Sequence, residues 1–315
     1  MLTRALLCAA CALAVTATTA HAAFPGQNGK IVFTSYDDVQ GDIFTMSPNG
    51  RHLVNLTLGS PSDDGFARWS ADGRMLAFDS NRAGPGNPTG DYEIFVMNAD
   101  GSGVRQVTYN TLDDGNVAWS PGGDRLLFHR WFGDWDSDLI TVRVNGAGER
   151  NVTRSPGVMD RQGAWSPDGR EIAFSHGGDE IARPDIYTIH PDGSQLRQLT
   201  STPADEEDPN WSPDGKKIAF HSDRTAPDEQ WDVWVMRRDG GGQTRLTTTT
   251  GYHARWSPDG RKIAFNSDRL GQSEIFTMRA DGSRERRRTH LPLTHETLPD
   301  WQPLPASRRG EEDDD

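Results

Sequence analysis

Cysteine is nearly absent from the chain, and its two copies, Cys8 and Cys11, both fall within the first 22 residues. We expect these 22 residues to be a signal peptide, because Arg4 precedes an apolar run over 5–15 and Ala20-His21-Ala22 is a small-x-small cleavage site. Cleavage after this site would leave a chain without cysteine. That excludes disulfides, thiol catalysis and cysteine-based metal sites.

Two alternatives for the N-terminal run are an internal apolar helix and a lipid anchor on Cys11. The run has no accompanying polar face, and Cys8-Ala9-Ala10 makes a poor lipobox. No later stretch is apolar enough to span a bilayer. We therefore expect a secreted or periplasmic protein without a membrane span.

Large apolar residues are scarce as well, since Leu, Ile, Val and Phe make up about 18% of the chain. Beside a net charge of −13, so low a fraction usually indicates disorder. In this chain, however, Trp and Ala recur at regular spacing and supply the burial. The excess of acids argues against a nucleic-acid partner and is compatible with a basic protein, a cation or a neutral ligand.

A repeat of about 45 residues runs through the chain. Its clearest copies, at 211–220 and 256–265, read Trp-Ser-Pro-Asp-Gly followed by a basic pair and Ile-Ala-Phe. This phrase predicts two strands joined by a tight turn, because Pro presets φ and Asp-Gly accepts a left-handed conformation. A third strand, as at 274–278, and a short fourth strand ending in Thr, as at 245–247, complete the unit. The six Trp positions are Trp69, Trp119, Trp165, Trp211, Trp256 and Trp301.

The two ends of the repeat region are complementary halves of one unit. Residues 29–57 supply strands two to four, and residues 298–301 supply a first strand with nothing after it. We therefore predict an all-β, six-bladed β-propeller of four-stranded antiparallel blades over residues 23–303, closed by the C-terminal strand joining the N-terminal blade. An open solenoid, the alternative, would need capping ends. Residues 304–315 are predicted to be a disordered acidic tail.

Positions that recur in every copy are interpreted as structural, with Trp, Ile and Phe packing sheet on sheet. An acid opens the third strand of each unit, and an Arg ends the second strand in four units. We expect these acids and arginines to be partners within their blade. The acids are Asp42, Glu93, Asp138, Asp185, Asp232 and Glu274, and the arginines are Arg82, Arg130, Arg224 and Arg269.

The phrases resemble the TolB-type propeller repeat, a variant of the WD-repeat family, over about residues 29–303. The resemblance implies fold strongly and function weakly. In the family's namesake the propeller follows an N-terminal domain, acts in the periplasm and binds a peptidoglycan-associated lipoprotein at its channel mouth. This chain is expected to be a propeller-only relative, so those partners do not carry over directly.

Loop lengths divide the predicted propeller into two faces. The short, repetitive turns between strands one and two and between three and four lie on one face, which we call the bottom. The loops between strands two and three, and from strand four to the next blade, are longer and differ in every blade; they form the top face. Diversity on a rigid scaffold predicts binding at the top.

Each Trp is preceded by three positions, at five, three and one residues before it, whose side chains are expected to lie on one face at the channel mouth. Side chains alternate along a strand, so these three positions should point the same way. Five residues before the Trp stand Asp64, Asp114, Asp160, Glu206, Gly251 and Glu296, for which loop bonding to backbone N–H groups is the alternative role. Three before it stand Phe66, Asn116, Gln162, Asp208, His253 and Leu298. One before it stand Arg68, Ala118, Ala164, Asn210, Arg255 and Asp300.

Aromatic residues outside the repeat add to this surface. Trp131, Trp135 and Trp231 belong to top loops, where an exposed indole would stack on a sugar or anchor a protein, the alternative being packing on its own blade. The predicted binding residues are Asp64, Asp114, Asp160, Glu206, Asp208, His253, Arg255, Glu296, Asp300, Trp131, Trp135 and Trp231.

Metal and catalytic motifs are incomplete. Asp134, Asp136 and Asp138 alternate like calcium ligands, but the Gly and Glu of a calcium loop are missing. His129 and His221 occupy equivalent blade positions and are interpreted as structural. His176 and His253 would have to converge on the top face to form a metal site. We thus expect no cofactor, with calcium as the alternative.

The sequence favours a monomeric, non-enzymatic binding module that recognises an envelope or extracellular protein, or a cell-wall glycan, through the acidic top face and channel mouth of the propeller. The alternative is a metal-assisted polysaccharide lyase or hydrolase with its site in the channel. A scaffold that binds through its blade rims is the third candidate.

Overall fold

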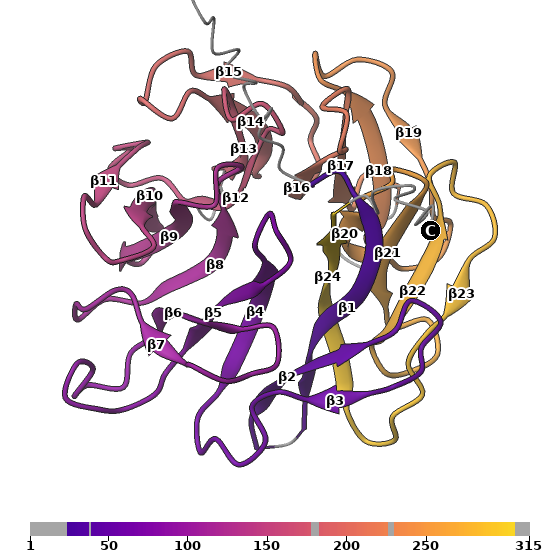
Figure 1. Cartoon of the computed structure of the whole chain (residues 1–315). Coiled ribbons are helices and arrows are strands. Elements are labelled where there is room, and N and C mark those ends of the chain that lie inside the picture. Colours follow the sequence, from indigo (N-terminus) through magenta and orange to yellow (C-terminus); the bar gives the residue numbers. More distant parts are fainter. Residues whose placement is uncertain (1–23, 38, 178–182, 226–229, 306–315) are drawn as a thin grey trace, which may run out of the picture.

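The computed structural model describes residues 24–37, 39–177, 183–225 and 230–305, and within these ranges every regular element is a strand. The strands form six four-stranded antiparallel sheets arranged as blades around a ring (Figure 1). This confirms the predicted six-bladed propeller. The predicted signal peptide and most of the predicted acidic tail lie outside the described residues. No helix capable of spanning a membrane occurs within the described ranges.

Every blade has four strands, ordered below from the innermost to the outermost. Blade 1 is β24 (His295–Leu304), β1 (Gln27–Tyr36), β2 (Gly41–Met46) and β3 (Val54–Asn55), and blade 2 is β4 (Asp64–Trp69), β5 (Met75–Ser80), β6 (Glu93–Asn98) and β7 (Arg105–Gln106). Blade 3 is β8 (Asp114–Trp119), β9 (Arg125–Gly133), β10 (Asp136–Arg143) and β11 (Arg150–Asn151), and blade 4 is β12 (Asp160–Trp165), β13 (Ile172–His176), β14 (Asp185–Ile189) and β15 (Arg197–Gln198). Blade 5 is β16 (Glu206–Trp211), β17 (Lys217–Ser222), β18 (Asp232–Arg237) and β19 (Thr244–Arg245), and blade 6 is β20 (Tyr252–Trp256), β21 (Lys262–Ser267), β22 (Glu274–Arg279) and β23 (Arg286–Arg287).

Blade 1 is assembled from both ends of the repeat region. The C-terminal strand β24 pairs antiparallel with β1, with Trp301 opposite Ile31 and Glu296 opposite Ser35. In Figure 1 the yellow β24 lies beside the indigo β1. The ring is therefore closed by the C-terminal strand, as the half-units of the sequence predict.

The apolar core lies between neighbouring blades. Val32 and Ile43 of blade 1 pack with Trp69 and Phe78 of blade 2, and equivalent clusters join the other blade pairs. The repeat Trp residues are almost completely buried in these clusters. Their recurrence is thus a packing requirement, because each indole fills the space between two twisted sheets.

The Ser-Pro-Asp-Gly turns stabilise themselves with their own side chains. In blade 5 the Ser212 hydroxyl donates to Asp214 at 2.7 Å, and the same carboxylate oxygen accepts the backbone N–H of Lys216 at 3.1 Å. In blade 3, where glycine replaces that Asp, Ser120 donates to Asp124 instead. These local bonds explain why the phrase recurs on the bottom face.

Gly73 ties one of these turns to the strand that closes the ring. Its φ is +67°, and a Cβ would lie 2.2 Å from the carbonyl oxygen of Pro303. Gly123 adopts φ +70° in the same turn of blade 3, but nothing lies within 4 Å of its Cβ position. We expect Gly73→Ala to lower the free energy of unfolding by about 2–3 kcal/mol and Gly123→Ala by about 1 kcal/mol in urea titrations. Equal losses would contradict the contact with β24.

Candidate functional site

A β-bulge interrupts the innermost strand of every blade, three residues before its Trp. In blade 2, Gly65 pairs with Asp79 and Arg68 with Ala77, so two residues oppose Phe78 alone. The bulged residue has a positive φ in all six blades although none is glycine. These residues are Phe66, Asn116, Gln162, Asp208, His253 and Leu298, with φ between 48° and 58°.

The bulge makes the expected shared face wrong. The extra residue shifts the alternation, so the position five before each Trp shares the face of the Trp, while the positions four and one before it share the opposite face. The carboxylates five residues before the Trp are consequently turned into the blade. Strict alternation predicted them at the channel mouth beside the other two sets.

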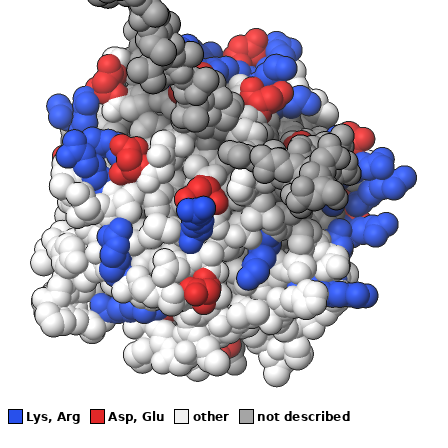
Figure 2. Space-filling model, in the orientation of Figure 1, with Lys and Arg blue, Asp and Glu red and all other residues white. Residues whose placement is uncertain are grey.

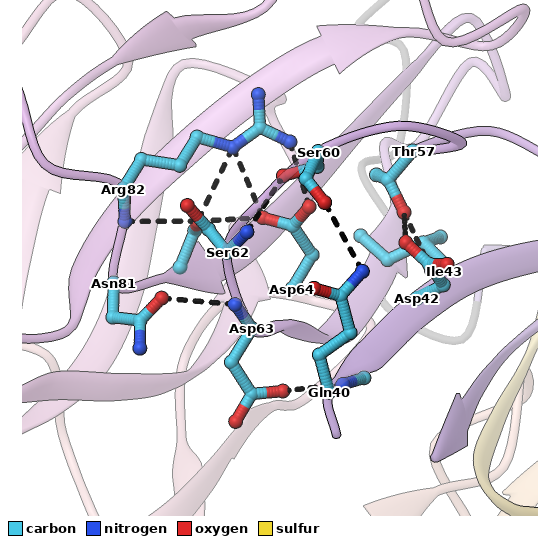
Figure 3. Close-up of polar contacts among 12 residues, drawn as sticks. Gln40, Asp42, Ile43, Thr57, Ser60, Ser62, Asp63, Asp64, Asn81 and Arg82 are labelled. Carbon is cyan, nitrogen blue, oxygen red and sulfur yellow. Dashed lines mark hydrogen bonds and ion pairs between the residues drawn. The ribbon is translucent and has the colours of Figure 1, made fainter. Parts of the chain in front are cut away.

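Asp64 shows what these carboxylates do (Figure 3). It is completely buried and accepts hydrogen bonds from Ser80 at 2.5 Å and from Arg82 at 2.8 and 3.0 Å. The neighbouring Asp63 backbone N–H bonds the Asn81 side chain. Asp64 therefore joins its strand to the end of β5.

The equivalent carboxylates have equivalent side-chain partners within their blades. Asp114 pairs with Arg130, Asp160 with His176, and Glu206 with Arg224, and Glu296 bonds Ser35 and Thr294. All four are completely buried. The alternative role, bonding to loop N–H groups, is replaced by these side-chain partners.

On the face seen in Figure 2, the charges of both signs are interspersed with uncharged residues.

The arginines that end strand two thus take different partners from those expected. Arg82, Arg130 and Arg224 bond the carboxylate of strand one, and Arg269 bonds Glu285. The acids that open strand three bond the Thr of strand four instead, as Asp42 does with Thr57 (Figure 3). Both sets are structural.

The central channel is narrow and contains the ion pair of Arg255 with Asp208. Its cavity volume is about 70 Å³. Arg255 donates two hydrogen bonds of 2.8 Å to Asp208, while Asp300 accepts the Trp69 backbone N–H at 2.9 Å. Phe24 lines the bottom end. Pockets for drug-sized ligands measure about 300–1,000 Å³, so this cavity is several times smaller than such a pocket.

Two histidines in neutral form, His221 and the partly exposed His253, lie near the mouth of the channel. His253 bonds Asn266 at 2.8 Å, and its ring centroid lies 5.5 Å from that of His221. Burial lowers the pKa of His221 to about 3 and also lowers that of His253. Both rings thus act as uncharged polar groups.

The three tryptophans predicted in top loops differ in exposure, and one of them, Trp131, lies in strand β9 rather than in a loop. Trp131 packs edge-on against His129 at 5.5 Å, and Trp231 packs edge-on against His221 at 4.8 Å; both are partly buried. Trp135 is 46% exposed. It is the most exposed of the three.

The weak calcium candidates do not converge in the structure. Asp138 is buried and accepts hydrogen bonds from Asn151, Thr153 and the Ser155 backbone. The described part of the chain contains no group of three or more His, Cys, Asp or Glu residues placed to hold a metal ion.

A second cavity, which we call the top-face pocket, opens between blades 1 to 4. Its volume is about 350 Å³, and its walls include Tyr36, Asp63, Asp79, Tyr92, His129 and Trp131. Of the predicted binding residues, Trp131 and Asp114 line it. Asp79 sits at the strand-two position that is His129 in blade 3 and His221 in blade 5. The variability of that position was the signal that could have revealed it.

Asp79 should cost the protein stability above neutral pH. Burial raises its pKa to about 7, against the backbone N–H of Asn116 and the charge of Arg68, which lower it; Asp63 raises it further. An unfolded Asp loses its proton near pH 4, so the free energy of unfolding falls between about pH 4 and 7. We expect Asp79→Asn to raise the free energy of unfolding by about 2 kcal/mol at pH 8 and to leave it nearly unchanged at pH 4. Urea titrations at both pH values check this; equal shifts would contradict it.

The fold and the paired, buried interior of each blade define a closed six-bladed β-propeller. Residues 119–229 match the PD40 family, the TolB beta propeller domain. TolB from Acinetobacter baumannii superposes with a TM-score of 0.72 at 18% identity, covering 87% of this chain and 67% of that one. The chain therefore carries a TolB-like six-bladed propeller.

Curated relatives match over part of the chain. An uncharacterized protein of Agrobacterium fabrum is 33% identical over 142 residues, which cover 42% of this chain and 46% of that protein. A TolB homolog of Chlorobium luteolum is 32% identical over 134 residues, covering 41% of this chain and 28% of that protein. The chain spans less than half the length of these relatives, so their similarity supports the fold.

Proposed function

We propose that this chain is a secreted or periplasmic binding module that recognises a partner protein through the top face of its propeller. The observation that carries the proposal is the distribution of exposed apolar side chains. Most of the large ones exposed within the described residues lie at the top face, including Leu58 at 83%, Leu293 at 82% and Trp135 at 46%. The others at this face are Val39, Tyr109 and Leu270 in top loops and Phe132 near the end of β9.

Exposed apolar residues around a pocket are typical of protein-binding surfaces, where aromatic anchors supply most of the affinity. The ring of blades beneath supports this use, because it fixes the ends of the loops and so reduces the entropy that is lost at binding. The export of the chain rests on the signal-like residues 1–22. A TolB-like propeller is consistent with an envelope protein as partner.

Capture experiments with matched variants test the proposal. The top variant carries Leu58→Ser and Trp135→Asn, since Asn tolerates the φ of +60° at that position. The control carries Val104→Ser and Leu196→Ser, two exposed apolar residues near the turns between strands three and four. Cell-envelope extracts are crosslinked to each tagged protein, and bound proteins are quantified by mass spectrometry.

We expect a specific protein to be retained by the wild type and the control and reduced about tenfold by the top variant, equal to about 1.4 kcal/mol. Equal retention by both variants would contradict a top-face site. Loss in the control alone would place the binding surface near the bottom face.

A further inference from the structure

The top-face pocket contains a buried carboxylate without a cation. Asp79 is 4% exposed, and its Oδ2 accepts the backbone N–H of Asn116 at 3.0 Å. No side chain within the described ranges donates a hydrogen bond to this carboxylate, which lines the pocket. A carboxylate in such a place normally has a charged partner.

Neighbouring cations are directed elsewhere. Arg68, the nearest in its electrostatic effect, donates to the carbonyl oxygens of Ala67 and Leu298. Arg161, on the pocket wall, is bonded to Glu207 at 2.5 Å. Neither guanidinium therefore neutralises Asp79 by direct contact.

The other groups of the pocket add negative charge. Asp63 accepts the Tyr92 hydroxyl at 2.5 Å, and Asp113 accepts the Tyr92 backbone N–H at 2.8 Å; both carboxylates line the pocket. His129, also on the wall, is 5% exposed, and burial lowers its pKa to about 3, so its ring is neutral. The lining thus favours a positively charged guest.

The walls and floor fit a flat or slender cation. Tyr36, Phe66, Tyr92 and Trp131 supply aromatic rings, which attract cations that lie over their faces. Gly65 and Gly115 leave space beside the carboxylate. A Cβ on Gly65 would lie 3.4 Å from Asp79 Oδ1, and one on Gly115 would lie 3.2 Å from Oδ2.

We propose that the top-face pocket binds one guanidinium or ammonium group, with Asp79 as its counter-ion and the aromatic side chains as its walls. The source is a basic side chain that the partner protein inserts; this part of the inference rests on the proposed function. A free amine of small size has the same chemistry, and the experiment separates the two sources.

The probes are Nα-acetyl-arginine methylamide and the citrulline compound that differs from it by the loss of charge. Isothermal titration calorimetry at pH 8 is expected to show at least about tenfold tighter binding of the arginine compound. Asp79→Asn should abolish that preference, whereas Asp134→Asn, which removes an exposed acid from a top loop outside the pocket, should keep it.

Gly115→Ala keeps every charge and narrows the pocket, so it should weaken binding of the arginine compound by about tenfold while thermal unfolding confirms the fold. Equal binding of the arginine and citrulline compounds would overturn the proposal. So would an unchanged preference in Asp79→Asn, or tight binding of a neutral disaccharide that Asp79→Asn leaves intact.

Partner capture then identifies the source. Reduced capture by Asp79→Asn, beside normal capture by Asp134→Asn, supports insertion of a basic side chain. If the arginine compound binds but capture is unchanged, the cation site stands and its ligand is a free amine. If capture also fails to respond to the apolar top variant, the proposed function fails independently.

Discussion

Replacing Asp208 with Asn is expected to lower the free energy of unfolding by about 3–5 kcal/mol, because it leaves the buried guanidinium of Arg255 without its counter-ion. Both side chains are at least nine-tenths buried and are joined by two hydrogen bonds of 2.8 Å. Asn retains the shape of the side chain and tolerates the φ of +54°. The loss therefore reports the charge and its hydrogen bonds rather than backbone strain.

The double variant Asp208→Asn with Arg255→Met provides the control, since it removes the stranded charge and should recover more than half of the loss. Urea titrations at pH 7 measure both variants against the wild type. A loss below about 1 kcal/mol for Asp208→Asn would mean that water reaches Arg255 through the channel.

The same pair predicts acid sensitivity. Burial alone would raise the pKa of Asp208, but the Arg255 guanidinium overcomes this and holds it well below its usual range. Its contribution is present above the unfolded pKa near 4 and is lost as the pH falls through the folded value. The wild type should thus lose more stability than the double variant between about pH 4 and 2.

The fold could be predicted from the sequence because its determinants are local and repeated. Trp-Ser-Pro-Asp-Gly phrases encode a hairpin through φ preferences and side-chain bonds of the kind seen at Ser212 and Asp214. Ring closure was predicted because the two ends of the repeat region are complementary halves of one unit. The pairing of β24 with β1 confirms this prediction. Six copies of one signal leave few alternative topologies.

The site was less predictable because a bulge has no strong sequence signature. Phe66 and Leu298 are poor candidates for a left-handed conformation, yet both adopt it. One extra residue then turned Asp64 and its equivalents into the blades. Side-chain alternation gives the wrong face wherever two residues of one strand oppose a single residue of the next. The position of such a bulge depends on the pairing between strands, which the sequence of one strand does not reveal.

The position after the strand-two Phe would have been a better guide. It holds Asp79, His129 and His221 in three blades, and only the histidines were recognised as equivalent. A residue that varies in polarity inside an otherwise repeated strand cannot be explained by sheet packing alone. That Asp79 has no cation in direct contact, however, becomes visible only in the folded structure, where blades 1 to 4 together form the pocket.

Removing β24 is expected to abolish the cooperative unfolding of the whole propeller. A chain ending at Leu293 would lose the pairing of β24 with β1 and the indole of Trp301, which packs between Ile31 of blade 1 and Ile275 of blade 6. The edge of β1 would be left with unpaired backbone groups, and such an edge pairs readily with another chain. Size-exclusion chromatography with light scattering should show oligomers, and urea titration should show a broad transition.

A synthetic peptide of residues 294–305 tests whether closure itself is responsible. Added in excess, it should restore a monomer and a single sharp transition, because it supplies the missing strand and returns the Trp301 indole to its cluster. The same peptide with Trp301→Ala should restore less, since a buried Trp→Ala change costs about 3–5 kcal/mol. A truncated chain that stayed monomeric and unfolded as sharply as the wild type would show that five complete blades are stable alone. Ring closure would then be a consequence of the fold rather than a condition for it.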